Sequence, residues 1–121
     1  MVLEYPRRKT LEDKEMFDDV VNGILSVLGD DVVKIILYGS VARGDNTWES
    51  DVDIAVLTKR EIDRERHDEL IHVSSVLGLE YDTLVSIITI DEKRFQEWLF
   101  ALPLYFNIDE EGITLWTSDA T

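Results

Sequence analysis

The sequence predicts a single α+β domain in which helical and strand patterns follow in the order α-β-β-α-β-α-β. Two observations carry this prediction. Apolar residues recur at helical spacing within 10–28 and 60–77, whereas short apolar runs rich in β-branched residues occur at 32–38, 51–58 and 81–90. The chain has 121 residues, 45% of them hydrophobic, which is enough for one core and excludes a disordered tail.

The N-terminal elements follow from local patterns. Residues 1–9 are expected to form a leader, and Thr10 to cap the first helix of a domain that spans 10–121. Gly29 is expected to end this helix, and residues 32–38 to form a buried strand. The apolar face of the helix consists of Phe17, Val20, Val21, Ile24 and Leu28.

The later elements are assigned in the same way. A polar connection with room for one helical turn covers 39–50, and the second strand covers 51–58. We expect a helix over 60–77 that Gly78 closes, and a third strand over 81–90. The next helix begins at Asp91 and stops before Pro103, and an irregular turn from Leu104 leads to a last short strand over 113–116.

Charge and composition limit the classes of partner. The formal net charge is −14, from 26 acidic and 12 basic residues, so we expect no nucleic acid as the main partner, since nucleic-acid binding depends on clustered Lys and Arg. No apolar stretch approaches the ~18–20 residues that cross a bilayer, and the N-terminus lacks the apolar core of a signal peptide. We therefore expect a cytoplasmic protein with no membrane contact. The absence of cysteine excludes disulfides and thiolate metal ligands.

Asp51 and Asp53 form the pattern that most directly predicts chemistry. They alternate with apolar residues on a strand, so their carboxylates face the same side, roughly 6–7 Å apart. Two charges at that distance repel by about 2–3 kcal/mol at an effective dielectric near 20. A divalent cation between them removes this repulsion, and oxygen ligands favour Mg²⁺ or Mn²⁺. The alternative is an exposed strand end where both acids face water.

A site for two metal ions usually needs a third carboxylate from a neighbouring strand. Asp82, at the expected start of the third strand, is the best candidate, and Glu80 is the next. Both residues could equally be solvated acids at a strand edge.

Gly39 and Ser40 form a turn at the end of the first strand. Glycine lets a phosphate approach the backbone, and Ser40 offers its N–H and its hydroxyl at the start of a helical turn, where anions are favoured. Arg43 could neutralise phosphate charge or pair with Asp45, and Trp48 could cover the mouth of the site. The chain lacks a Walker A motif and a Gly-x-Gly-x-x-Gly motif, which excludes those two kinds of phosphate loop.

The segment Gly39-Ser40-x10-Asp51-Val52-Asp53 resembles the signature of nucleotidyltransferases of the DNA polymerase β superfamily. The size of the chain and its tail, from Leu102 to Trp116, look like the minimal nucleotidyltransferase (MNT) branch, the HEPN-partnered antitoxin type. The resemblance implies a mixed β-sheet with helices packed on it, as in the polymerase β palm.

The resemblance also implies roles for residues and partners. Asp51, Asp53 and a third acid, Asp82, would be catalytic and hold two Mg²⁺ ions, with Mn²⁺ as an alternative, while Gly39, Ser40 and Arg43 would bind the phosphates of ATP or another NTP. The implied reaction transfers AMP to a hydroxyl of a partner protein, a HEPN-domain toxin, within a homo- or hetero-oligomer.

Two other functions remain open on the sequence. The first is a catalytically inactive binding module that keeps the fold and sequesters its partner. The second is a transferase that acts on a small hydroxyl compound. Relatives of that kind carry an extra helical domain, for which 121 residues leave no room.

Overall fold

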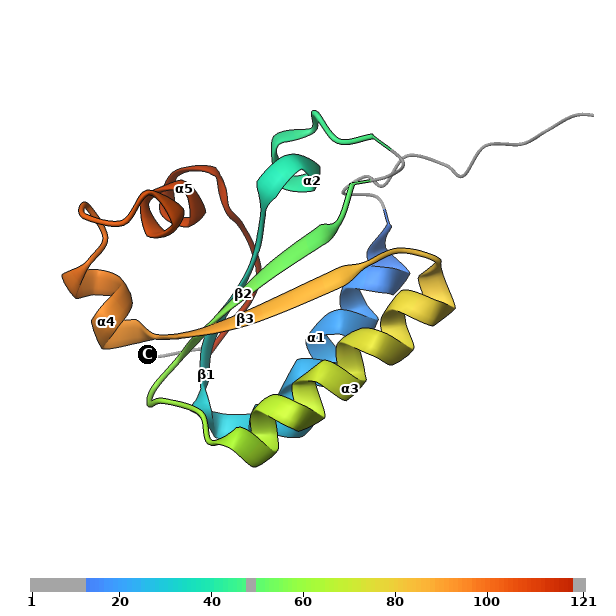
Figure 1. Cartoon of the computed structure of the whole chain (residues 1–121), viewed down its shortest axis with the longest axis horizontal. Coiled ribbons are helices and arrows are strands. Elements are labelled where there is room, and N and C mark those ends of the chain that lie inside the picture. Colours follow the sequence, from blue (N-terminus) through green and yellow to red (C-terminus); the bar gives the residue numbers. More distant parts are fainter. Residues whose placement is uncertain (1–12, 48–49, 119–121) are drawn as a thin grey trace, which may run out of the picture.

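A four-stranded mixed sheet organises the protein (Figure 1). The computed structural model describes residues 13–47 and 50–118, so the expected leader, the Thr10 cap and Trp48 lie outside the described residues. The strand order is β3-β2-β1-β4, and the bounds are β1 Val32–Tyr38, β2 Val52–Thr58, β3 Val85–Asp91 and β4 Ile113–Thr117. β1 runs antiparallel to β2 and β4, whereas β2 and β3 are parallel. The predicted α+β fold is confirmed.

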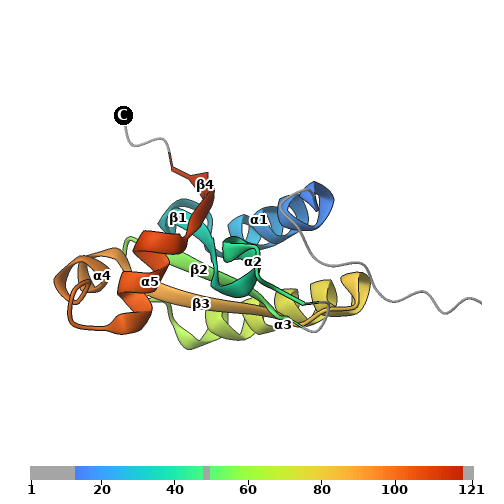
Figure 2. The same cartoon turned by 90° about the horizontal axis from the view of Figure 1, so that it is seen from above.

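Two long helices cover one face of the sheet. α1 (Lys14–Leu28) and α3 (Arg64–Tyr81) lie side by side in both views (Figures 1 and 2). The apolar stripe predicted for the first helix is buried here except for Val21, which is partly buried, and its residues pack with alternate residues of β1 and β2. Tyr81 also donates a hydrogen bond to Asp19, which ties the end of α3 to α1.

Shorter elements cover the other face. α4 (Glu92–Glu97) and α5 (Pro103–Glu111) pack on the remaining residues of β1, β2 and β3, with Phe95, Tyr105 and Ile108 at the centre of this second core. The short helix α2 (Gly39–Arg43) joins β1 to β2, and a 3₁₀ turn, η1 (Gly29–Asp31), joins α1 to β1. No helix among the described residues is both long and apolar enough to cross a bilayer.

The predicted end of the long helix at Gly78 is wrong. α3 continues to Tyr81, and Asp82 adopts the left-handed conformation (φ 50°, ψ 49°) that ends it. Gly78 serves a different purpose: a Cβ atom there would lie 2.7 Å from the carbonyl oxygen of Thr83, so glycine lets the chain turn back closely over the helix. The third strand therefore begins at Val85 rather than at residue 81.

The predicted irregular turn after Pro103 is also wrong. Pro103 is the first residue of α5, where the missing N–H of proline leaves no hydrogen bond unmade. Gly112 ends α5 and packs against β1, since a Cβ atom there would clash with the carbonyl oxygen of Ile108 and with the side chain of Ile36. The last strand, β4, matches the prediction within one residue.

Candidate functional site

The pairing of β1 with β2 assembles the two predicted motifs. Tyr38, the last residue of β1, lies opposite Asp53 in the antiparallel register. The Gly39-Ser40 turn follows Tyr38 directly, and Asp51 comes just before β2. The Gly39-Ser40 turn, which forms the start of α2, and the acidic pair therefore meet at one end of the sheet (Figure 1).

Gly39 lies directly against the carboxylate of Asp53. Its φ is +78°, and a Cβ atom built on it would lie 2.5 Å from Asp53 Oδ2. Glycine is thus required at this position for two reasons: the backbone is left-handed, and the carboxylate approaches closely. The sequence suggested that this glycine admits a phosphate; the structure shows that it admits Asp53.

The surroundings of Asp53 disfavour the charged form of its carboxyl group. Burial raises the pKa of Asp53 above its ordinary value, the negative charge of Asp51 raises it further, and Arg43 opposes both effects. Burial and the charge of Asp53 also raise the pKa of the neighbouring Tyr38 hydroxyl. The two carboxylates therefore lie close enough to repel, as their spacing predicted, and a bound cation would relieve that repulsion.

Arg43 links α2 to α5. Its Nε lies 3.1 Å from Asp45 Oδ2, and its Nη1 lies 3.1 Å from Glu111 Oε2 at the end of α5. Of the two roles left open for Arg43, the structure shows the pairing with Asp45. Glu111 had no signal in the sequence because it lies 68 residues away. Arg43 remains partly exposed and close enough to Asp53 to lower the pKa of that carboxyl.

The structure does not place Asp82 on a strand. Asp82 follows α3 in a left-handed turn and precedes β3, so the predicted position at the start of a strand is wrong. Glu80 lies in the last turn of α3. Within 13–47 and 50–118, no three His, Asp or Glu side chains gather closely enough to hold a metal ion.

A further polar side chain, Ser86, lies near the acidic pair. It lies on β3 in parallel register with Asp53. The acidic pair and this hydroxyl give hard oxygen donors only, which suits Mg²⁺ or Mn²⁺. The strand expected over 81–90 already contained Ser86, but only the pairing register of β3 with β2 shows that Ser86 lies beside Asp53.

A cavity of about 510 Å³ lies at the opposite end of β2 and β3, lined by Thr58, His67, Thr89 and the first turns of α4 among others. It contains neither the glycine turn nor the acidic pair. Acidic and basic side chains both line this cavity, so its charge does not indicate one kind of ligand.

The chain is similar to known nucleotidyltransferases in sequence. Residues 19–112 match the family model for the nucleotidyltransferase domain. The chain is also 32% identical over 109 residues to "Putative protein adenylyltransferase MJ0604" of Methanocaldococcus jannaschii, covering 88% of this chain and 100% of that protein.

Solved structures share the fold. A toxin–antitoxin structure with AMP-PNP has a TM-score of 0.59 at 20% identity and covers 85% of this chain and 74% of that chain. A tri-AMPylated HEPN toxin of Shewanella oneidensis in complex with an MNT antitoxin has a TM-score of 0.54 at 18% identity, covering 87% and 72%. The matched segment contains the turn, the acidic pair and Ser86.

Proposed function

Because the chain belongs to the nucleotidyltransferase domain family, we propose that it transfers AMP from ATP to a hydroxyl group of a partner protein. The observation that carries the proposal is the contact between the two motifs: Gly39 packs on Asp53, and Tyr38 pairs with Asp53 across the strands. The glycine-serine turn and the acidic pair thus form one continuous surface.

The proposed roles follow from positions. Asp51 and Asp53 hold Mg²⁺ or Mn²⁺, and their crowding is the repulsion that a cation offsets. Ser40 and Arg43, on α2, face the terminal phosphates of the nucleotide. When bound, the cation neutralises charge that develops on the α-phosphate.

The transfer is a displacement at the α-phosphorus. The acceptor oxygen forms a bond to this phosphorus, and the bond from the phosphorus to the bridging oxygen of the β-phosphate breaks. Pyrophosphate leaves with the bonding electron pair, and the proton of the acceptor hydroxyl is released. Arg43 and the backbone N–H groups at the start of α2 offset the charge of the leaving pyrophosphate.

The acceptor is proposed to be a HEPN-domain protein. The relative from M. jannaschii carries the name "Putative protein adenylyltransferase MJ0604", and one structure with this fold is a complex of an MNT antitoxin with a tri-AMPylated HEPN toxin. Both describe other proteins: the first supports a protein as the acceptor, and the second supports a HEPN-domain protein as that acceptor.

Intact-mass spectrometry tests this function. The protein encoded next to this chain is purified after co-expression with the wild type, with Asp51→Asn or with Asp53→Asn. We expect one or more added AMP masses with the wild type and none with either variant, while both variants fold, because each substitution removes repulsion between carboxylates. An AMPylated partner with either variant would refute the assigned roles.

A binding module without catalysis is the second candidate. The observation that favours it is that Asp51 and Asp53 have no third carboxylate beside them among the described residues. An unmodified partner that co-purifies equally with the wild type and both variants would establish this function instead.

A further inference from the structure

Ser86 and Asp53 present their side chains on one face of the sheet. The parallel register places them directly beside each other. The next residues on this face, Ala55 of β2 and Ile88 of β3, pack together in the core beneath α4 and α5, as alternation along both strands requires. The residue at position 86 therefore faces the same space as the carboxylate of Asp53.

The distance between strands sets what a side chain at position 86 can reach. Neighbouring strands lie about 4.8 Å apart, so an aspartate there could share one cation with Asp53. Serine offers a neutral oxygen on a shorter side chain in its place. Across the part of the chain that the structure describes, the Ser86 hydroxyl has no hydrogen-bond partner, and the side chain is only partly buried.

We infer that Ser86 stands at the position of the third carboxylate, so that the protein offers a divalent cation two carboxylates and one hydroxyl. The inference rests on the proposed function, because it assumes a cation at Asp51 and Asp53. Fewer charged ligands mean weaker binding of the free cation. Phosphate oxygens of the nucleotide supply the missing negative charge, so the cation and the nucleotide bind together.

The first test adds the carboxylate back. Binding of Mn²⁺ alone is measured by isothermal titration calorimetry for the wild type, Ser86→Asp and Ser86→Asn. We expect Ser86→Asp to bind Mn²⁺ about tenfold more tightly than the wild type, since a third charged ligand is added. Ser86→Asn, which has the same shape without the charge, gives no such gain. Equal affinities in Ser86→Asp and the wild type would overturn the inference.

A second test does not depend on the stability of Ser86→Asp, which places three carboxylates together. The chain contains no cysteine, so Ser86→Cys introduces a single thiol with little change in volume. We expect Cd²⁺ to bind this variant with a thiolate-to-metal absorption band that the further substitution Asp53→Asn removes. Ser75→Cys, exposed on α3, is the control and binds Cd²⁺ weakly and independently of Asp53. The same Cd²⁺ affinity in both cysteine variants would contradict the inference.

Two further variants separate this inference from the proposed function. Asp53→Asn is expected to lose Mn²⁺ binding, and unchanged binding would refute the metal site itself. Asp82→Asn keeps a residue that tolerates the left-handed conformation and is expected to bind Mn²⁺ like the wild type. Loss of Mn²⁺ binding in Asp82→Asn would instead identify Asp82 as the third ligand and remove that role from Ser86.

Discussion

At the residue scale, Gly39 couples the backbone of the turn to the acidic pair. Its positive φ and its contact with Asp53 Oδ2 are separate constraints, and the chain offers a control for the first. Gly44 has nearly the same φ, +79°, but a Cβ atom there would meet nothing within 4 Å. The two glycines therefore separate backbone strain from displacement of the carboxylate.

We expect Gly39→Ala and Gly44→Ala each to lose about 1–2 kcal/mol of unfolding free energy, because alanine disfavours the left-handed region. Only Gly39→Ala forces Asp53 to move, so only this variant also loses Mn²⁺ affinity. Urea unfolding without metal and calorimetric Mn²⁺ titration measure the two effects. Equal losses of Mn²⁺ affinity in both variants would contradict the assigned role of Gly39.

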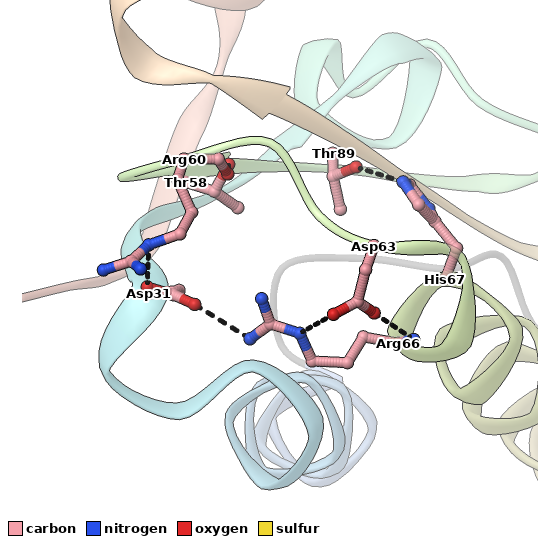
Figure 3. A network of polar contacts seen from close by, with 7 residues as sticks. All are labelled: Asp31, Thr58, Arg60, Asp63, Arg66, His67 and Thr89. Atoms are coloured by element: carbon pink, nitrogen blue, oxygen red, sulfur yellow. Dashed lines mark hydrogen bonds and ion pairs between the residues drawn. The ribbon is translucent and has the colours of Figure 1, made fainter.

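At the element scale, Asp31 joins η1 to the β2–α3 loop and to the start of α3, which follow each other in the sequence (Figure 3). It lies in η1, and its carboxylate lies 2.8 Å from Arg66 Nη1 of α3 and 3.0 Å from Arg60 Nε in the β2–α3 loop. Its backbone carbonyl accepts a hydrogen bond from the N–H of Lys59. Asp31 thus fixes the start of β1 relative to the start of α3.

The ion pairs of Asp31 predict that the stability of the protein depends on pH. The hydrogen bond from Arg66 and the charges of Arg60, Arg66 and Lys59 hold the pKa of Asp31 below 3.8, against a smaller opposing effect of burial. A lowered pKa stabilises the folded state above the unfolded pKa, and this contribution is lost as the pH falls through the folded pKa. We expect Asp31→Asn to be less stable than the wild type from neutral pH to about pH 5, and the difference to narrow below about pH 4.

Thermal unfolding of the two proteins across this pH range checks the prediction. Asp30→Asn is the matched control, because Asp30 is exposed and makes no ion pair with another described residue. A difference between the wild type and Asp31→Asn that stayed constant down to pH 2.5 would show that the charge of Asp31 is not the cause.

At the scale of the whole molecule, the main feature is a large negative net charge. Twenty-six acidic residues against twelve basic ones give a net charge of −14 on a small domain. The ion pairs of the described residues involve few of these acids, so self-repulsion opposes the compact state at low ionic strength. The same charge disfavours association of two copies and favours a basic protein partner.

We therefore expect added NaCl to stabilise the protein, because screening weakens this repulsion. A gain of about 1 kcal/mol between 20 and 500 mM NaCl would raise the melting temperature by roughly 3–6 °C. Differential scanning calorimetry measures the shift in melting temperature. Sucrose solutions of the same osmolality as the NaCl solutions are the control for non-ionic effects. A melting temperature that falls with salt would show that the ion pairs outweigh the repulsion.

The sequence by itself determined the two motifs and the elements beside them. β1 and β2 follow from apolar alternation and runs of β-branched residues, which act over a few residues. The antiparallel pairing of these two strands then brings Gly39 against Asp53, where the sequence had suggested a bound phosphate. Only the tertiary structure decided which residue lies beside Asp53. The register of β3 depends on how far α3 runs and on the left-handed turn at Asp82, where the chain reverses, and it places Ser86 beside Asp53. Contacts between distant strands fix that register, and no local pattern encodes it.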